Sequence, residues 1–146
     1  MGKVYQQTKR RMGKVNKIAI DTMVLIYLIN NQEPYVETIK ERLHSAKEII
    51  LSSVGMGEIL AGFEKNNDKK GKLQFLSFLE SYKKLSVIGF GKQESLIFGE
   101  LRGKYPTIKA ADAIHLATAI SSRVDCFLTN DKKLEIVKDI TIMSLV

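Results

Sequence analysis

Four acidic side chains are spaced along the chain so that an α/β fold with a parallel sheet would gather them at one edge. They are Asp21, Glu58, Asp112 and Asp131. Two carboxylates about 5 Å apart repel each other by about 3 kcal/mol at an effective dielectric constant of about 20. A converging group of acids therefore requires a compensating positive charge. Carboxylate oxygens without a His or Cys cluster favour Mg²⁺ or Mn²⁺ over zinc.

Two of these acids follow apolar runs that are typical of buried strands. Asp21 directly ends the run at 17–20, and Asp131 comes shortly after the run at 126–129. Functional groups of open parallel sheets lie beyond the carboxyl ends of the strands, where the loops converge. Asp125 opens the second run and lies about 13 Å from its far end at about 3.3 Å per residue, so it is excluded from the site.

The other two acids belong to predicted helices. Glu58 and Asp112 lie five residues after Ser53 and Thr107, which are expected helix caps, so both acids are expected in a second helical turn. The helix at 110–121 is apolar almost all round and should be buried. A carboxylate on a buried helix needs a partner or a cation, because a lone buried charge costs several kcal/mol or becomes protonated.

Each acid also has a purely structural explanation. Asp21 could be a strand-end turn residue, Glu58 an exposed helix residue, Asp112 an acid near a helix start and Asp131 a cap. Only the combination of all four favours a metal site.

Apolar runs alternate with amphipathic segments, which predicts an α/β fold of three layers around a mainly parallel sheet. Expected strands lie at 17–20, 49–51, 85–88, 126–129 and 140–145. A first helix is expected directly after Asp21, a second at about 36–45, and a third with Ser52 or Ser53 as its cap. The polar stretch 65–72 is expected to be a connection. Further helices are expected at 73–82, in the segment that stops before Pro106, at 110–121 and at 132–137.

The net charge of +7 is unevenly distributed along the 146 residues. Residues 1–17 carry six basic and no acidic side chains, which leaves 17 basic against 16 acidic residues in the remainder. We divide the chain into a basic arm at 1–16 and a single domain at 17–146. The arm is compatible with phosphate binding and equally with a solvated, disordered terminus.

The sequence favours a cytoplasmic protein that does not enter membranes. No apolar stretch reaches the 18 residues of a membrane span, and the basic start of the chain lacks the apolar core of a secretory signal. The single cysteine, Cys126, cannot form a disulfide within one chain.

The acidic motifs resemble those of the PIN-domain nucleases in order and spacing from about residue 17 to 146. The segments are Ile18-Ala19-Ile20-Asp21-Thr22, Glu58 in the helix after Ser52-Ser53, Ala111-Asp112-Ala113-Ile114-His115-Leu116-Ala117, and Leu128-Thr129-Asn130-Asp131. The compact size is most similar to the VapC-type ribonuclease toxins of type II toxin-antitoxin systems. The basic arm is a departure, because those toxins begin almost directly at the first strand.

The resemblance implies an α/β/α sandwich with about five parallel strands and Mg²⁺- or Mn²⁺-dependent cleavage of single-stranded RNA. It assigns the four acids to the catalytic metal site, and Thr22 and Thr129 to hydroxyl positions that orient acids or metal-bound water. Thr22 is also compatible with a helix cap. Implied partners are an RNA substrate, an antitoxin protein and a second copy of the chain.

Other functions fit the sequence less well. A haloacid dehalogenase-type phosphatase needs an acid two positions after Asp21, where this chain has Met23. No glycine cluster follows a strand, so a phosphate-cradling loop is absent. A non-catalytic RNA-binding module on the same fold, or a nuclease acting on structured RNA or branched DNA, stays open. His115, three residues after Asp112, is interpreted as a hydrogen-bonded core histidine, with support of the acids as the alternative.

Overall fold

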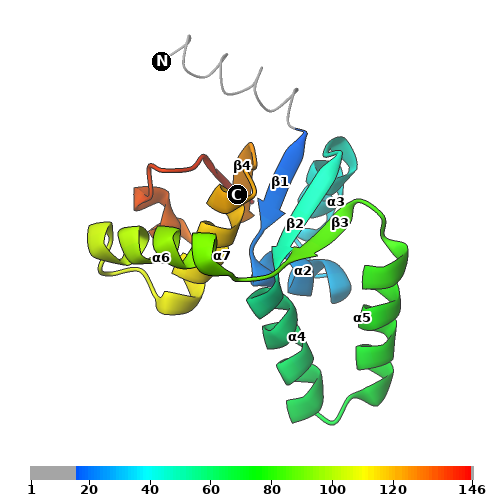
Figure 1. The fold of residues 1–146 in the computed structure, drawn as a ribbon. Coiled ribbons are helices and arrows are strands. Elements are labelled where there is room, and N and C mark those ends of the chain that lie inside the picture. Colours follow the sequence, from blue (N-terminus) through cyan, green and yellow to red (C-terminus); the bar gives the residue numbers. More distant parts are fainter. Residues whose placement is uncertain (1–15, 146) are drawn as a thin grey trace.

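The computed structural model describes residues 16–145. Over that range the chain alternates strands and helices from end to end (Figure 1). The strands are β1 (Lys17–Ile20), β2 (Glu48–Ser52), β3 (Leu85–Ile88), β4 (Cys126–Thr129) and β5 (Ile142–Ser144). The α-helices are α2 (Thr22–Ile29), α3 (Val36–Ser45), α4 (Ser53–Lys65), α5 (Lys69–Ser81), α6 (Lys92–Lys104) and α7 (Ala110–Ser121), and a 3₁₀ helix, η1, spans Lys132–Ile136.

The sheet has five parallel strands in the order β3-β2-β1-β4-β5. The chain moves from β1 to β2 on one side and returns to β4 on the other, so the strand order reverses beside β1. Such a reversal separates the connecting loops and opens a crevice at the carboxyl ends of the two strands. The predicted three-layer fold with a parallel sheet is confirmed, and the crevice lies where Asp21 and Asp131 were expected.

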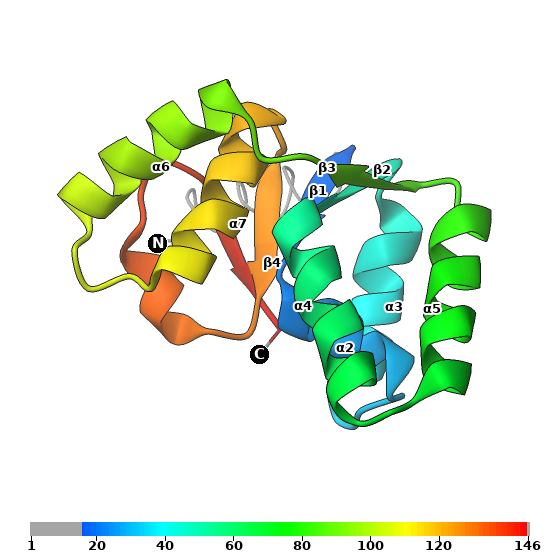
Figure 2. The ribbon, with the colours of Figure 1, turned by 60° about the horizontal axis from the view of Figure 1, so that its bottom comes forward.

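Helices cover both faces of the sheet (Figures 1 and 2). Alternate residues of β1 point to opposite faces: Ile18 and Ile20 join the core under α2 and α3, and Ala19 joins the core under α6 and α7. Burial on both faces explains why the strands read as continuous apolar runs in the sequence.

Two helix starts differ from the sequence prediction. Asp68 caps α5 by accepting a hydrogen bond from the Gly71 amide at 2.8 Å, so the helix begins at Lys69 within the stretch predicted as a connection. Glycine is needed at position 71 in this first turn of α5, because a Cβ there would lie 2.7 Å from the Phe63 ring.

The second difference is at α7. Thr107 does not cap this helix, which begins at Ala110 with Lys109 at the cap position and no side-chain cap bond.

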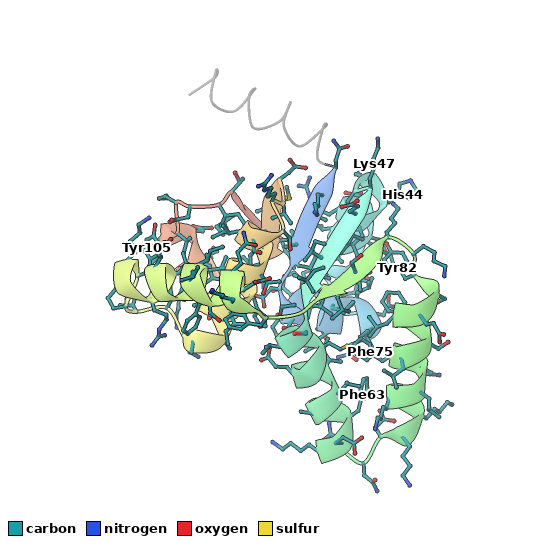
Figure 3. All side chains as sticks on the ribbon, in the orientation of Figure 1. His44, Lys47, Phe63, Phe75, Tyr82 and Tyr105 are labelled. Atoms are coloured by element: carbon teal, nitrogen blue, oxygen red, sulfur yellow. The ribbon has the colours of Figure 1, made fainter. Side chains whose placement is uncertain are left out.

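Helices α4 and α5 form a hairpin beside the sheet, and Phe63 and Phe75 face each other between them (Figure 3). Their ring centroids are 5.9 Å apart. An open groove of about 440 Å³, lined by both apolar and polar residues, lies between this hairpin and the end of α2. Leu28, Phe63 and Phe78 line the groove, with Asp68 at its edge.

Among residues 16–145, no helix combines the length and apolar character that crossing a membrane requires. Cys126 is a buried free thiol, and burial raises its pKa to about 11. The basic arm predicted at 1–16 lies outside the described residues except for its last position, Asn16.

Candidate active site

Thr129 connects the two acids at the strand ends. Its hydroxyl donates to Asp21 Oδ2 at 2.8 Å and accepts a hydrogen bond from the Asp131 amide at 3.0 Å. Thr129 is buried at the end of β4, and Asp21 is only 7% exposed after β1. Asp131 also caps η1, since its Oδ1 accepts from the Lys133 amide at 3.0 Å. The strand-end geometry thus fixes both carboxyl groups at the crevice.

Asp112 faces the same crevice from α7. The pKa of its carboxyl group is raised above the ordinary value, first by burial and then by the negative charges of Asp21 and Asp131. Asp112 lies in the first turn of α7, not in the predicted second turn, because the helix begins only two residues earlier. Within residues 16–145, none of these three acids forms an ion pair with a lysine or arginine. Lys109 and His115 offset part of the repulsion at Asp112, but burial and the two neighbouring acids outweigh them.

Glu58 is held in position by His115. The Nε2 atom of the buried imidazole lies 2.8 Å from Glu58 Oε1, and its Nδ1 atom lies 2.6 Å from Ser52 Oγ. Ser52 accepts the Gly55 amide as the N-cap of α4 at 2.9 Å, so its own proton is free for Nδ1. The tautomer that satisfies every group carries its proton on Nε2 and donates it to Glu58.

Thr22 adds a second donor to the same carboxylate. Its hydroxyl donates to Glu58 Oε1 at 3.1 Å and lies 3.3 Å from His115 Nε2. Thr22 is the first residue of α2, and the N-cap position belongs to Asp21, so the alternative of a Thr22 cap is wrong. The close approach of α4 to α2 requires Gly55, because a Cβ there would meet Thr22 Oγ1 at 2.8 Å. Both predicted hydroxyl residues therefore contact the predicted acids.

The donor set suits Mg²⁺ or Mn²⁺ in its chemistry. All four predicted ligands are carboxylates, and the interaction of Asp112 with two of them shows that three share one electrostatic environment. Among residues 16–145, no three His, Cys, Asp or Glu side chains are already grouped tightly enough to enclose an ion. Mg²⁺ commonly takes only one or two carboxylates, with water and substrate phosphate as its other ligands. An incomplete cage of protein ligands is therefore compatible with such an ion.

A cleft of about 300 Å³ opens beside two of the acids. Its lining residues are Thr107, Ile108, Lys109, Asp112, Asp131, Lys133, Leu134 and Ile136. Asp125 lies away from this cleft and holds the start of β1 by accepting the Asn16 and Lys17 amides at 2.9 and 3.0 Å. Its predicted exclusion from the site is confirmed.

Sequence reasoning did not identify Ser52 or the two cleft lysines, Lys109 and Lys133, as residues of this region. It considered His115 mainly as a core histidine, and the structure shows both burial and support of an acid. The available signal was the spacing of three between Asp112 and His115, which places both on one helix face. The contact of His115 with Glu58 joins residues 57 positions apart and leaves no local pattern.

Several solved structures share this fold. VapBC2 from Rickettsia felis, bound to a promoter DNA fragment, has a TM-score of 0.73 at 22% identity, with 88% of this chain and 98% of that chain covered. VapBC-1 from nontypeable Haemophilus influenzae has a TM-score of 0.70 at 18% identity, with 88% and 98% covered. VapC20 from Mycobacterium tuberculosis, described as a sarcin-ricin loop cleaving toxin, has a TM-score of 0.66 at 15% identity, with 82% and 93% covered.

No curated protein sequence matches the chain. The sequence profile of the PIN domain matches residues 18–140, a range that contains all four acids, the whole of β2, β3 and β4, and β1 except its first residue. The order of the acids, the five-stranded parallel sheet and this match agree, and the chain belongs to the PIN domain family.

Proposed function

We propose that the protein is a Mg²⁺- or Mn²⁺-dependent endoribonuclease that acts as the toxin of a toxin-antitoxin pair. The observation that carries the proposal is the gathering of three acids: Thr129 connects Asp21 to Asp131, and Asp131 lines one cleft with Asp112. Burial and the charges of Asp21 and Asp131 raise the pKa of Asp112, in agreement with this proximity. Three acids that repel one another at the crevice of a PIN domain favour a cation between them. Burying acids that lack a salt bridge costs free energy, so stability alone does not explain their arrangement.

In this proposal Asp21, Asp112 and Asp131 hold the ion, and Glu58 completes the acidic site from α4. A bound divalent cation lowers the pKa of its water ligand and offsets charge on the phosphate oxygens. Thr129 fixes the orientation of Asp21, while His115 and Thr22 fix that of Glu58. These hydrogen bonds restrict the orientation of the two carboxylates before a ligand binds, so less reorganisation accompanies the reaction.

RNA is the proposed substrate because the domain is similar to VapC20, a toxin described as cleaving the sarcin-ricin loop. The first experiment measures hydrolysis of labelled single-stranded RNA by the full chain with Mn²⁺ and with a chelator. Asp112→Asn removes one proposed ligand, and Glu135→Gln, an exposed acid on η1, is the matched control. We expect cleavage by the wild type and the control only, and only with metal.

The main alternative is a non-catalytic RNA-binding module. It is supported if the wild type binds RNA but does not hydrolyse it with Mn²⁺ present. Preferential cleavage of branched DNA would instead support a structure-specific nuclease. Either result would overturn the proposed ribonuclease activity while leaving the fold assignment intact.

The proposed protein partner is an antitoxin, since a similar Klebsiella pneumoniae structure is described as a toxin-antitoxin complex and VapBC-5 from Mycobacterium tuberculosis as a member of a toxin-antitoxin family. The groove between α2 and the α4–α5 hairpin offers such a partner a surface, and Ile29, one of its lining residues, is 40% exposed. We expect the product of an adjacent reading frame to inhibit cleavage, and Ile29→Asp to weaken that inhibition without reducing basal cleavage. The expected homodimer stays a prediction, and light scattering at several concentrations tests it.

The proposed setting is the cytoplasm, which is compatible with the buried free thiol of Cys126.

A further inference from the structure

The cleft beside Asp112 and Asp131 has two unlike halves. Asp112 and Asp131 form the acidic part of its lining, and Ile108, Leu134 and Ile136 form the apolar part. Ile108 and Leu134 are almost fully buried, but Ile136 is 47% exposed. A large aliphatic side chain exposed at the edge of a cleft is free to cover the flat face of a ligand.

Two cations lie on the same cleft. Lys109 precedes α7, and Lys133 belongs to η1. Both are exposed, and neither forms an ion pair within residues 16–145. The surface therefore combines apolar contact area with ammonium groups on both walls and an acidic end.

The two walls of the cleft are tied together behind its lining. The Tyr105 hydroxyl donates to Asp139 Oδ1 at 2.7 Å and accepts from the Lys138 amide at 3.1 Å, while Lys104 Nζ donates to Asp139 Oδ2 at 2.7 Å. Arg102 also donates to the carbonyl of Ile108 in the cleft wall. These bonds connect the α6–α7 segment to the segment after η1. The cleft is thus built in advance of any ligand, which reduces the ordering cost of binding.

We propose that this cleft binds one nucleotide of single-stranded RNA next to the phosphate at the acidic site. The base lies against Ile136 and its apolar neighbours, and the flanking phosphates contact Lys109 and Lys133. This inference rests on the proposed function and adds the substrate subsite that positions the strand. Single strands suit such a site because an unstacked base exposes its face, whereas a duplex buries it.

The chemistry of the cleft excludes simpler ligands. A free phosphate would use the lysines but leave the apolar wall exposed to water, and an apolar molecule would leave the lysines and acids without a role. A nucleotide supplies an apolar face and an anion within one unit. Contacts to base faces and backbone phosphates are the usual combination in single-strand binding.

The test measures affinity for a short fluorescein-labelled single-stranded RNA by anisotropy, with a chelator present so that no cleavage occurs. A series of RNAs carries one abasic position at successive places. Ile136→Ala is compared with Leu96→Ala, another highly exposed aliphatic residue, which lies on α6 outside the cleft. Lys109→Ala and Lys133→Ala are compared with Lys132→Ala, which removes the same charge beside the cleft but not from its lining.

We expect Ile136→Ala to weaken RNA binding about fivefold, because the contact area of several buried carbon atoms is lost. The wild type should lose affinity at one abasic position, and Ile136→Ala should lose this sensitivity. Each cleft-lysine variant should reduce the salt dependence of affinity by about 0.7 in slope, and Lys132→Ala should not. Leu96→Ala should bind RNA like the wild type.

The subsite is overturned if Ile136→Ala keeps wild-type affinity and wild-type sensitivity to abasic positions. It is also overturned if the wild type shows no preferred abasic position. These results are independent of the proposed function: a protein that cleaves RNA with Mn²⁺ but fails this test lacks only the subsite. A protein that passes it but does not cleave with Mn²⁺ has the subsite and is not a ribonuclease.

Discussion

His115 and Glu58 join two helices at the candidate active site. The imidazole Nε2 of α7 lies 2.8 Å from the carboxylate Oε1 of α4. The histidine side chain is 5% exposed, while that of Glu58 is 44% exposed. A buried imidazole thus holds a partly exposed carboxylate, so the orientation of Glu58 is set before any ligand binds.

Replacement of His115 by leucine is expected to impair this positioning. We expect about tenfold or greater loss of Mn²⁺ affinity or of cleavage at saturating RNA, the usual effect of losing a residue that orients a metal ligand. Stability should fall by about 1–3 kcal/mol, because Ser52 loses a buried hydrogen-bond partner. His115→Gln, which keeps a donor for Glu58, should recover part of the activity. Wild-type kcat and Mn²⁺ affinity in His115→Leu would contradict the positioning role.

Thr129→Val should weaken the metal site from the opposite side. Valine keeps the shape of threonine but cannot donate to Asp21, so that buried carboxylate loses a charge-assisted hydrogen bond worth about 1.5–3 kcal/mol. Calorimetric titration with Mn²⁺ measures the change in affinity, and urea unfolding measures stability. Thr129→Ser retains the hydroxyl and serves as the control. Equal Mn²⁺ affinity in both variants would show that the hydroxyl is dispensable.

Asp112→Asn should stabilise the metal-free protein at neutral pH. The pKa of Asp112 is raised by folding, so the native state binds protons more readily than the unfolded state, and stability falls as pH rises through the raised pKa. The amide removes this cost. Urea unfolding with a chelator should show the gain near neutral pH and a smaller gain in acid. A variant that is equally destabilised at both pH values would contradict this electrostatic explanation.

Tyr105→Phe should loosen the cleft without affecting the acids. It removes a donor to Asp139 and an acceptor for the Lys138 amide at a cost of about 1 kcal/mol. The pKa of Asp139, which hydrogen bonds from Lys104 and Tyr105 lower, should rise toward its ordinary value. RNA affinity should decrease while Mn²⁺ affinity stays unchanged. Loss of Mn²⁺ affinity instead would show that the two regions are coupled.

The basic arm is tested by a chain that begins at Met12 and so lacks Lys3, Lys9, Arg10 and Arg11. If these residues contact the RNA backbone, binding at low salt should weaken and the salt slope should decrease by about 0.7 for each lost contact. Turnover at saturating RNA should change little, because the four acids remain. Parallel salt slopes for the two chains would rule out the contacts.

Local sequence patterns were sufficient to predict the strands and the parallel sheet, because burial on both faces leaves continuous apolar runs. They also placed Asp21 and Asp131 at strand ends. They failed at α5 and α7: Asp68 was not recognised as a cap within a charged stretch, and Thr107 was taken for a cap although the chain turns again before Ala110. Cap choice depends on backbone geometry that residue types only partly determine.

The assembly of the acidic site was harder to predict than its members. The bond from Thr129 to Asp21 joins positions 108 residues apart, and that from His115 to Glu58 joins positions 57 apart. Such contacts depend on strand order and on the close approach of α4 to α2 at Gly55. Neither feature leaves a periodic signal in the chain. The resemblance to a family predicts which acids form the site, but not which side chains hold them.

The position of β4 inside the sheet, next to the central strand β1, has a consequence for synthesis. One edge of β1 stays unpaired until β4 is synthesised, more than a hundred residues after β1 itself. A growing chain that has released only β1 to α6 can pair β1 with β2 but has neither Thr129 nor Asp131 to hold and complete the acids. Synthesis of β4 therefore adds a neighbour for β1 and completes the proposed acidic site in the same late step. Products truncated before β4 contain Asp21 and Glu58 but lack Thr129 and Asp131.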